Sequence, residues 1–189
     1  MLTMFEKAVL FFIDKIPGIG EVKLRKGLFL IDSLYYALYK KSLTGISYIK
    51  EKQGPVPDNK AYKKLIDILD KPYIINEYEL RGDYEKSSYR IDKKLFNEDL
   101  KFNESDKKLL MSVVNYISDK SGNELSKLTH GNVYNNTPMR SKMPLSKVVE
   151  FRINEEKDTK EPSNIKKLFK HMKKGLLKDA NFLQSIRQW

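Results

Sequence analysis

Residues 23–32 read KLRKGLFLID and are followed, after a loop, by GPVP at residues 54–57. From residue 24 onward, apolar side chains recur every three or four positions, a spacing that predicts an amphipathic helix; they are Leu24, Leu28, Ile31, Leu34, Tyr35 and Leu38. Asp32 interrupts this stripe, and a buried carboxylate needs a hydrogen-bond or charge partner. Lys26 and Asp32 are too far apart to pair along one helical turn. We therefore expect the partner of Asp32 outside the helix, either on the strand or loop before Gly54 or on the segment around His130.

The GPVP segment predicts a stiff, extended turn. Pro55 and Pro57 each fix their own φ and bias the preceding residue towards extended geometry. Gly54 can adopt backbone angles that are closed to other residues. Further along, LSKLTH at residues 125–130 predicts a short helix that ends at His130. A histidine in that position more often caps carbonyl groups than acts as an acid or base, because the helix dipole favours it there.

In this order, the three stretches resemble the Panacea domain of SocA-like antitoxins. Members of that family carry an early Lys-Leu-rich helix, a Gly-Pro-Val turn and a short helix ending in histidine. The resemblance covers roughly residues 5–140. The chain departs from the family pattern at Gly27, where a larger apolar residue is usual, at Gln53, where an aromatic is common, and at Tyr134, where tryptophan often follows the histidine.

The resemblance implies an antitoxin that binds a cognate protein toxin and neutralises it by contact, without catalysis and without a cofactor. Some relatives are thought to deliver the toxin to a protease, which would make a cellular protease a second partner. The residues implied for partner binding are Lys23, Lys26, Asp32, Gly54, Pro55, Val56 and His130. We expect the Gly-Pro-Val turn and His130 to lie close together and to shape one surface. The alternative, of equal weight, is that both only pack the fold.

Composition narrows the function classes further. The chain of 189 residues has no cysteine, which excludes disulfides, thiolate-bound metals and thiol catalysis. With His130 and His171 as the two histidines, a histidine-rich metal site cannot be built. The apolar run at residues 8–13 is far too short to span a bilayer, and no signal peptide is expected. These features predict a soluble, cytoplasmic protein with no metal, cofactor or membrane partner.

The net charge of +11 raises the possibility of nucleic-acid binding. Lysine outnumbers arginine by 30 to 6, whereas bidentate recognition of phosphate and guanine favours arginine. The turn IPGIG at residues 16–20 also matches that of a helix-hairpin-helix, whose glycine amides contact DNA phosphates. That motif normally has a small residue at the position of Leu24, which is bulky, and it needs a second hairpin, whereas no second PGIG occurs in this sequence. A DNA-binding regulator that uses this turn and the basic C-terminal tail is therefore the less favoured, alternative function, and an enzyme ranks third.

Periodicity and turn signals predict an α+β fold, a mainly helical single domain with a small antiparallel β-sheet and a C-terminal helical extension. A capping box at Thr3–Glu6 and an N-cap at Asp58 predict helix starts. A further helix is expected after Asn103 or Ser105, with Gly122 as its stop. The sequence predicts short strands at 47–51, 73–75, 78–80 and 89–91.

The last part of the chain predicts an appendage to a domain of residues 1–153. Residues 154–162 are charged and read as a linker, and residues 163–189 carry six lysines and one arginine against one aspartate. Phe182, Ile186 and Trp189 recur at helical spacing, and tryptophan is enriched in binding hot spots. We expect this amphipathic extension to dock on the partner or, as the alternative, on the domain itself.

Overall fold

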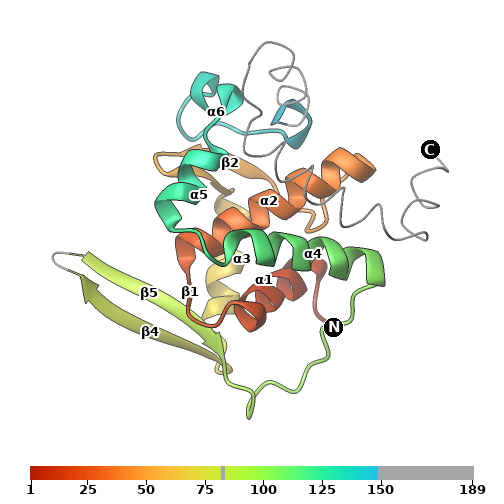
Figure 1. Cartoon of the computed structure of the whole chain (residues 1–189), viewed down its shortest axis with the longest axis vertical. Helices are drawn as coiled ribbons and strands as arrows, with labels where there is room; N and C mark the ends of the chain where they lie inside the picture. Colours follow the sequence, from red (N-terminus) through yellow and green to blue (C-terminus); the bar gives the residue numbers. More distant parts are fainter. Residues whose placement is uncertain (82–83, 149–189) are drawn as a thin grey trace.

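The computed structural model describes residues 1–81 and 84–148, which form an α+β fold with helices around a central helix, α2 (Glu21–Tyr39), and two small antiparallel sheets. Figure 1 shows α1 (Met4–Lys15) and α4 (Glu104–Ile117) lying beside α2, and both contact it. The other face of α2 meets strand β3 (Gly54–Pro57) and helix α5 (Gly122–Thr129). The fold class predicted from the sequence is confirmed.

Helix α1 begins at the predicted capping box. The Thr3 hydroxyl accepts a hydrogen bond from the Glu6 amide, and the Glu6 carboxylate accepts one from the Thr3 amide. All residues from Ala8 to Ile13 are buried, and they belong to a hydrophobic core that also contains residues of α2 and α4. Burial of this kind, rather than helix propensity, supplies most of the stability of a helix.

Gly27 of α2 packs closely against α1 and α4. A methyl group added there would meet the Ile117 Cδ1 at 3.0 Å and the Phe12 ring at 3.1 Å. The larger apolar residue that is usual at this position has no room here, because Phe12 and Ile117 fill the space. Side chains of α1 and α4 thus occupy the space that a larger residue at this position would need.

The first sheet has the strand order β1–β5–β4, formed by β1 (Ile19–Gly20), β4 (Ile74–Arg81) and β5 (Tyr84–Ile91). The sequence predicted two short strands at 73–75 and 78–80, which are one continuous strand paired to β5 from Ile74↔Ile91 onward. The β4–β5 hairpin reaches away from the helices (Figure 1).

Strand β1 was not predicted, because its residues read as an inter-helix turn. The Gly18 amide donates to the Tyr89 carbonyl and the Ile19 amide to the Ile16 carbonyl, both at 3.0 Å. These amides are therefore occupied inside the protein and are not free for DNA phosphates, as a helix-hairpin-helix would require. The turn serves the sheet instead.

The second sheet pairs β2 (Tyr48–Glu51) with β3. The GPVP segment, predicted as an extended turn, is thus a β-strand in full register with β2, from Tyr48↔Pro57 to Glu51↔Gly54. Helix α3 (Asn59–Leu69) follows and begins at Asp58, whose carboxylate accepts from the Ala61 amide as predicted.

Helix α4 begins at Asn103, one of the two predicted starts, and it buries the predicted apolar stripe. It ends at Ile117 rather than at Gly122, which opens α5 after the N-cap Ser121. The prediction of Gly122 as a stop was wrong, because Ser121 and Glu124 form a capping box that starts a new helix. A short helix, α6 (Asn132–Asn136), comes next.

The predicted linker and basic extension, with Phe182, Ile186 and Trp189, lie outside the described residues. Within residues 1–81 and 84–148, no helix has the length and apolar character needed to cross a membrane.

Candidate functional site

Lys26 of α2 is the centre of a polar cluster inside the protein. Its side chain is 1% exposed, and its Nζ donates a hydrogen bond to the Pro55 carbonyl oxygen at 3.1 Å. Thr129 and His130, at the end of α5, also lie beside Gly54. We call Lys26, Gly54, Pro55, Thr129 and His130 the Lys26 cluster; it joins one helix, one strand and one helix end.

Gly54 makes this convergence possible. Its φ of +107° is one that L-residues rarely adopt, and a Cβ built on it would lie 2.3 Å from the Lys26 Nζ. The same Cβ would lie 2.9 Å from the Thr129 Oγ1 and 3.2 Å from the His130 Nε2. Three polar side-chain atoms therefore surround the space that a side chain at residue 54 would occupy. The prediction that the Gly-Pro-Val segment and His130 lie close together is confirmed.

His130 is held by an aromatic ring and by a backbone group. Its ring stacks on the Tyr134 ring with centroids 4.0 Å apart and planes 4° from parallel. It also forms a hydrogen bond with the Gln53 backbone. The Nε2 atom is buried and has no hydrogen-bond partner among the described residues. The Nε2 atom and the Lys26 Nζ both lie beside the position that a Cβ of residue 54 would occupy.

Tyr134, at the position where the family often has tryptophan, attaches the β2–β3 hairpin to the segment after α5. Its hydroxyl hydrogen-bonds to the carbonyl oxygens of Glu51 and Lys52, at 2.7 and 3.0 Å. The Lys50 Nζ lies 4.5 Å from the centre of its ring. Tyr134 thus holds the tip of the β2–β3 hairpin while its face packs on His130.

Burial shifts the protonation of both basic groups in the cluster. Desolvation, with a smaller contribution from the charge of Arg25, lowers the pKa of Lys26 to about 7. Desolvation also lowers the pKa of His130, and the nearby charge of Lys26 lowers it further. His130 is therefore neutral at pH 7, whereas Lys26 exists in both forms. Shifts of this size occur at binding sites and in structural clusters alike.

Asp32 forms a second buried polar cluster on α2. It is 0% exposed, and its carboxylate accepts hydrogen bonds from the Thr44 amide at 2.9 Å, the Thr44 hydroxyl at 2.5 Å and the Tyr48 hydroxyl at 2.7 Å. Burial raises the pKa of Asp32, and these hydrogen bonds oppose that rise in part. The prediction that Asp32 finds its partner before Gly54 is confirmed. The partners are neutral, however, so no partner charge would be stranded by its removal.

The two clusters lie on the same helix but act on different segments. Asp32 fixes the loop at Thr44 and the start of β2, and the Tyr48 ring meets the Phe29 ring edge-on at 5.2 Å. The Lys26 cluster fixes the other strand and α5. Between them they hold both strands of the β2–β3 hairpin against α2. Thr44 and Tyr48 could not be singled out from the sequence, since an isolated Thr or Tyr near a strand carries no pattern.

Lys23 lies apart from the Lys26 cluster. Its Nζ donates to the Ser118 carbonyl oxygen at 2.8 Å, just beyond the end of α4. Desolvation lowers the pKa of Lys23. The structure therefore brings together Lys26, Gly54, Pro55 and His130 from the predicted set, with Val56 buried beside them in β3, and it leaves Lys23 at a separate helix contact.

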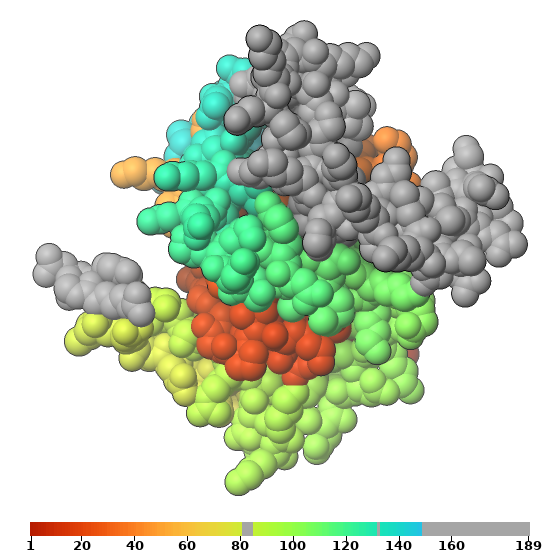
Figure 2. Space-filling view, viewed as in Figure 1, coloured from red at the N-terminus to blue at the C-terminus, as the bar shows by residue number. Residues whose placement is uncertain are grey.

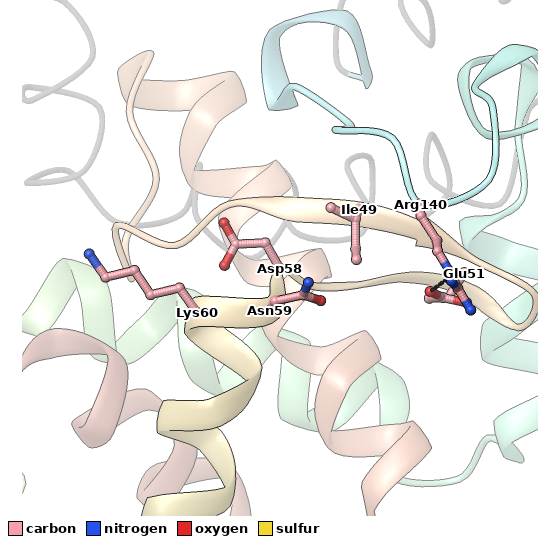
Figure 3. A pocket seen from close by; sticks show the side chains of 6 residues that line it. All are labelled: Ile49, Glu51, Asp58, Asn59, Lys60 and Arg140. Atoms are coloured by element: carbon pink, nitrogen blue, oxygen red, sulfur yellow. Dashed lines mark ion pairs between the residues drawn. The ribbon is translucent and has the colours of Figure 1, made fainter.

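A polar groove of about 530 Å³ opens on the outer side of the β2–β3 hairpin (Figure 3). Its lining residues come from β2, the start of α3 and the segment after α6; they are Ile49, Glu51, Asp58, Asn59, Lys60 and Arg140. The Arg140 Nε lies 3.7 Å from the Glu51 Oε1 across one end of the groove. Over residues 1–81 and 84–148, no three His, Asp or Glu side chains gather in a way that could hold a metal ion.

A comparison with family models matches residues 24–133 to the Antitoxin SocA-like, Panacea domain family. The match covers more than half of the chain and includes both polar clusters. No curated protein and no solved structure gave a match. The chain therefore belongs to the SocA-like Panacea antitoxin family.

Proposed function

We propose that this member of the SocA-like Panacea family neutralises a cognate toxin protein by binding it directly, and that it does so without catalysing a reaction. The observation that carries the proposal is the Lys26 cluster. It gathers the three sequence features typical of the family around Gly54, and it holds the β2–β3 hairpin in one position. A surface held in advance loses less conformational entropy when a partner binds.

The buried residues of the predicted set support this surface and do not form part of it. Lys26, Asp32 and Gly54 are buried, as are Pro55 and Val56, so their proposed role is to fix the shape of the hairpin. Among the residues around the β2–β3 hairpin, those proposed to contact the toxin are the exposed ones at its tip and along the groove. Lys52 and Gln53 are exposed at the tip, and Arg140 is exposed at the rim.

The test is co-expression with the product of the adjacent gene. We expect that product to stop growth when expressed alone, and to be neutralised by and co-purify with the intact chain. Lys26→Met should weaken both readouts, and Lys23→Met, which changes a lysine of the same helix outside the cluster, should leave them unchanged. A protein that restores growth without co-purifying, or that binds equally well with either substitution, would contradict the proposed mechanism.

Delivery of the toxin to a protease is a finer form of the same proposal. It predicts that the amount of toxin in the cell falls when the antitoxin is co-expressed, with its synthesis unchanged. Simple blocking predicts that the toxin accumulates in an inactive complex. Pulse–chase labelling of the toxin, with and without the antitoxin, separates the two forms.

A further inference from the structure

The β4–β5 hairpin continues the apolar surface of the core beyond the body of the protein. Where the hairpin meets the helices, Ile74, Tyr89 and Ile91 are buried. Further along β4, on the same face, Tyr78 and Leu80 are 62% and 82% exposed. Figure 2 shows this hairpin reaching out from one side of the molecule. Large apolar residues gathered on a projecting element mark an interaction site more often than isolated ones do.

Among the described residues, no strand pairs with the outer edge of β4. In the order β1–β5–β4, β4 is an edge strand of the described sheet. The Asp92 amide donates to the Tyr73 carbonyl oxygen at 2.8 Å, so odd-numbered residues of β4 face β5 with their backbone groups. In an antiparallel pair the alternate residues point their N–H and C=O groups the other way. Asn76, Tyr78 and Leu80 therefore direct these groups towards the open edge.

The opposite face of the hairpin has a charge order that suits one kind of partner. Arg90 and Lys86 on β5 pair with Glu77 and Glu79 on β4, at 2.7 and 4.0 Å. On this face, the basic side chains therefore lie on the inner strand β5 and the acidic side chains on the edge strand β4. A strand added beyond β4 would gain opposite-charge contacts if it carried lysine or arginine beside Glu77 and Glu79. It would gain apolar contacts beside Tyr78 and Leu80.

We propose that the free edge of β4 binds an extended segment of the toxin, in which apolar residues alternate with basic ones, as an added β-strand. This proposal rests on the toxin-binding function proposed above. Strand addition to a sheet edge is a common mode of peptide recognition, with backbone hydrogen bonds supplying affinity and alternate side chains supplying specificity. A second copy of the chain fits the edge less well, since in antiparallel self-pairing centred on Tyr78, Glu77 of one copy would face Glu79 of the other.

The variants for the test are Leu80→Pro and Leu80→Thr. Proline removes the outward N–H of residue 80 and blocks the edge, and it is tolerated in edge strands where that group faces solvent. Threonine keeps the N–H and the strand propensity but removes the apolar side chain. Thermal melting of both variants is expected to stay within about 3 °C of the native chain, because the residue is exposed and its substitution should cost little stability.

Two probes are used with the full chain. The first is the product of the adjacent gene, which we expect Leu80→Pro to bind about tenfold more weakly than the native chain, and Leu80→Thr about threefold more weakly. The second is a fluorescent eight-residue peptide in which valine alternates with lysine, compared with one in which glutamate replaces lysine. We expect the lysine peptide to bind about fivefold more tightly, and Leu80→Pro to remove that difference.

The outcomes separate this proposal from the function on which it rests. If the adjacent gene product binds the native chain and Leu80→Pro equally, the β4 edge is not the toxin site, although the antitoxin function stands. If that product binds no form of the chain, the antitoxin function fails and the peptides decide whether the edge accepts a strand. Equal binding of the lysine peptide to the native chain and Leu80→Pro overturns the proposal. A native dimer that Leu80→Pro converts to a monomer, seen by sedimentation, also overturns it.

Discussion

Gly54→Ala is the substitution that should disturb the Lys26 cluster most directly. A non-glycine residue at φ +107° stores strain of about 1–3 kcal/mol. The new methyl group also occupies a position 2.3 Å from the Lys26 Nζ, so the amine must retreat and lose its hydrogen bond to the Pro55 carbonyl, at a cost of about 1.5–3 kcal/mol. The more restricted unfolded chain returns about 0.5 kcal/mol. We expect a net loss of about 2–5 kcal/mol.

Gly45→Ala is the matched control for this prediction. Gly45 also has a left-handed φ, +74°, but an added methyl group would meet nothing within 4 Å. Gly45→Ala should lower the free energy of unfolding only through the unfavourable backbone angle, by about 1 kcal/mol. Urea denaturation followed by circular dichroism gives both free energies of unfolding. Equal losses for the two alanine variants would refute the view that Gly54 is needed for side-chain space rather than for backbone angle alone.

Three further predictions concern the two clusters and the tail. Because burial lowers the pKa of Lys26 to about 7, the folded state binds fewer protons than the unfolded state above that pH. The free energy of unfolding of the native chain, measured relative to Lys26→Met in urea titrations, should therefore rise by about 2 kcal/mol from pH 7 to pH 9. A difference between the two proteins that does not change with pH would contradict the lowered pKa. Asp32→Ala should lose about 3 kcal/mol or more in the same assay, since it leaves the Thr44 and Tyr48 donors buried without an acceptor, and Asp32→Asn, which keeps one acceptor oxygen, should lose clearly less. Truncation after Ile153 should leave a cooperatively melting domain and weaken neutralisation in the growth assay; full neutralisation would exclude docking of the tail on the partner, and failure to fold would show that the tail completes the core.

The elements that were predicted correctly are those whose signals are local. The helix starts at Thr3, Asp58 and Asn103 follow from side chains that cap their own backbone within three residues. The buried stripe of α2 follows from periodicity, which needs no knowledge of the rest of the fold. The partner of Asp32 could be placed in a segment for the same kind of reason, because a buried carboxylate must be satisfied and the helix itself offers no donor.

The elements that were predicted wrongly depend on contacts between distant residues. Ile19 and Gly20 form a strand only because β5, about 70 residues later, runs beside them. The GPVP segment forms a strand only because β2 supplies its partner, and two prolines argue against a strand when the sequence is read alone. The break expected in β4 near residue 76 is bridged by continuous pairing to β5. In each case tertiary pairing outweighed local preference.

The arrangement of the Lys26 cluster suggests why a lysine lies there at all. A buried ammonium with one carbonyl acceptor costs free energy, and an apolar residue of similar volume is often neutral or stabilising in such a place. Lys26 therefore contributes little to stability at pH 7, but its Nζ can satisfy the Pro55 carbonyl only when β3 lies at one height along α2. His130 and Thr129 restrict the same space from the side of α5. The cluster thus selects one position for the β2–β3 hairpin, which is the property that a preformed binding surface needs and that a purely apolar contact, free to slide, would supply less well.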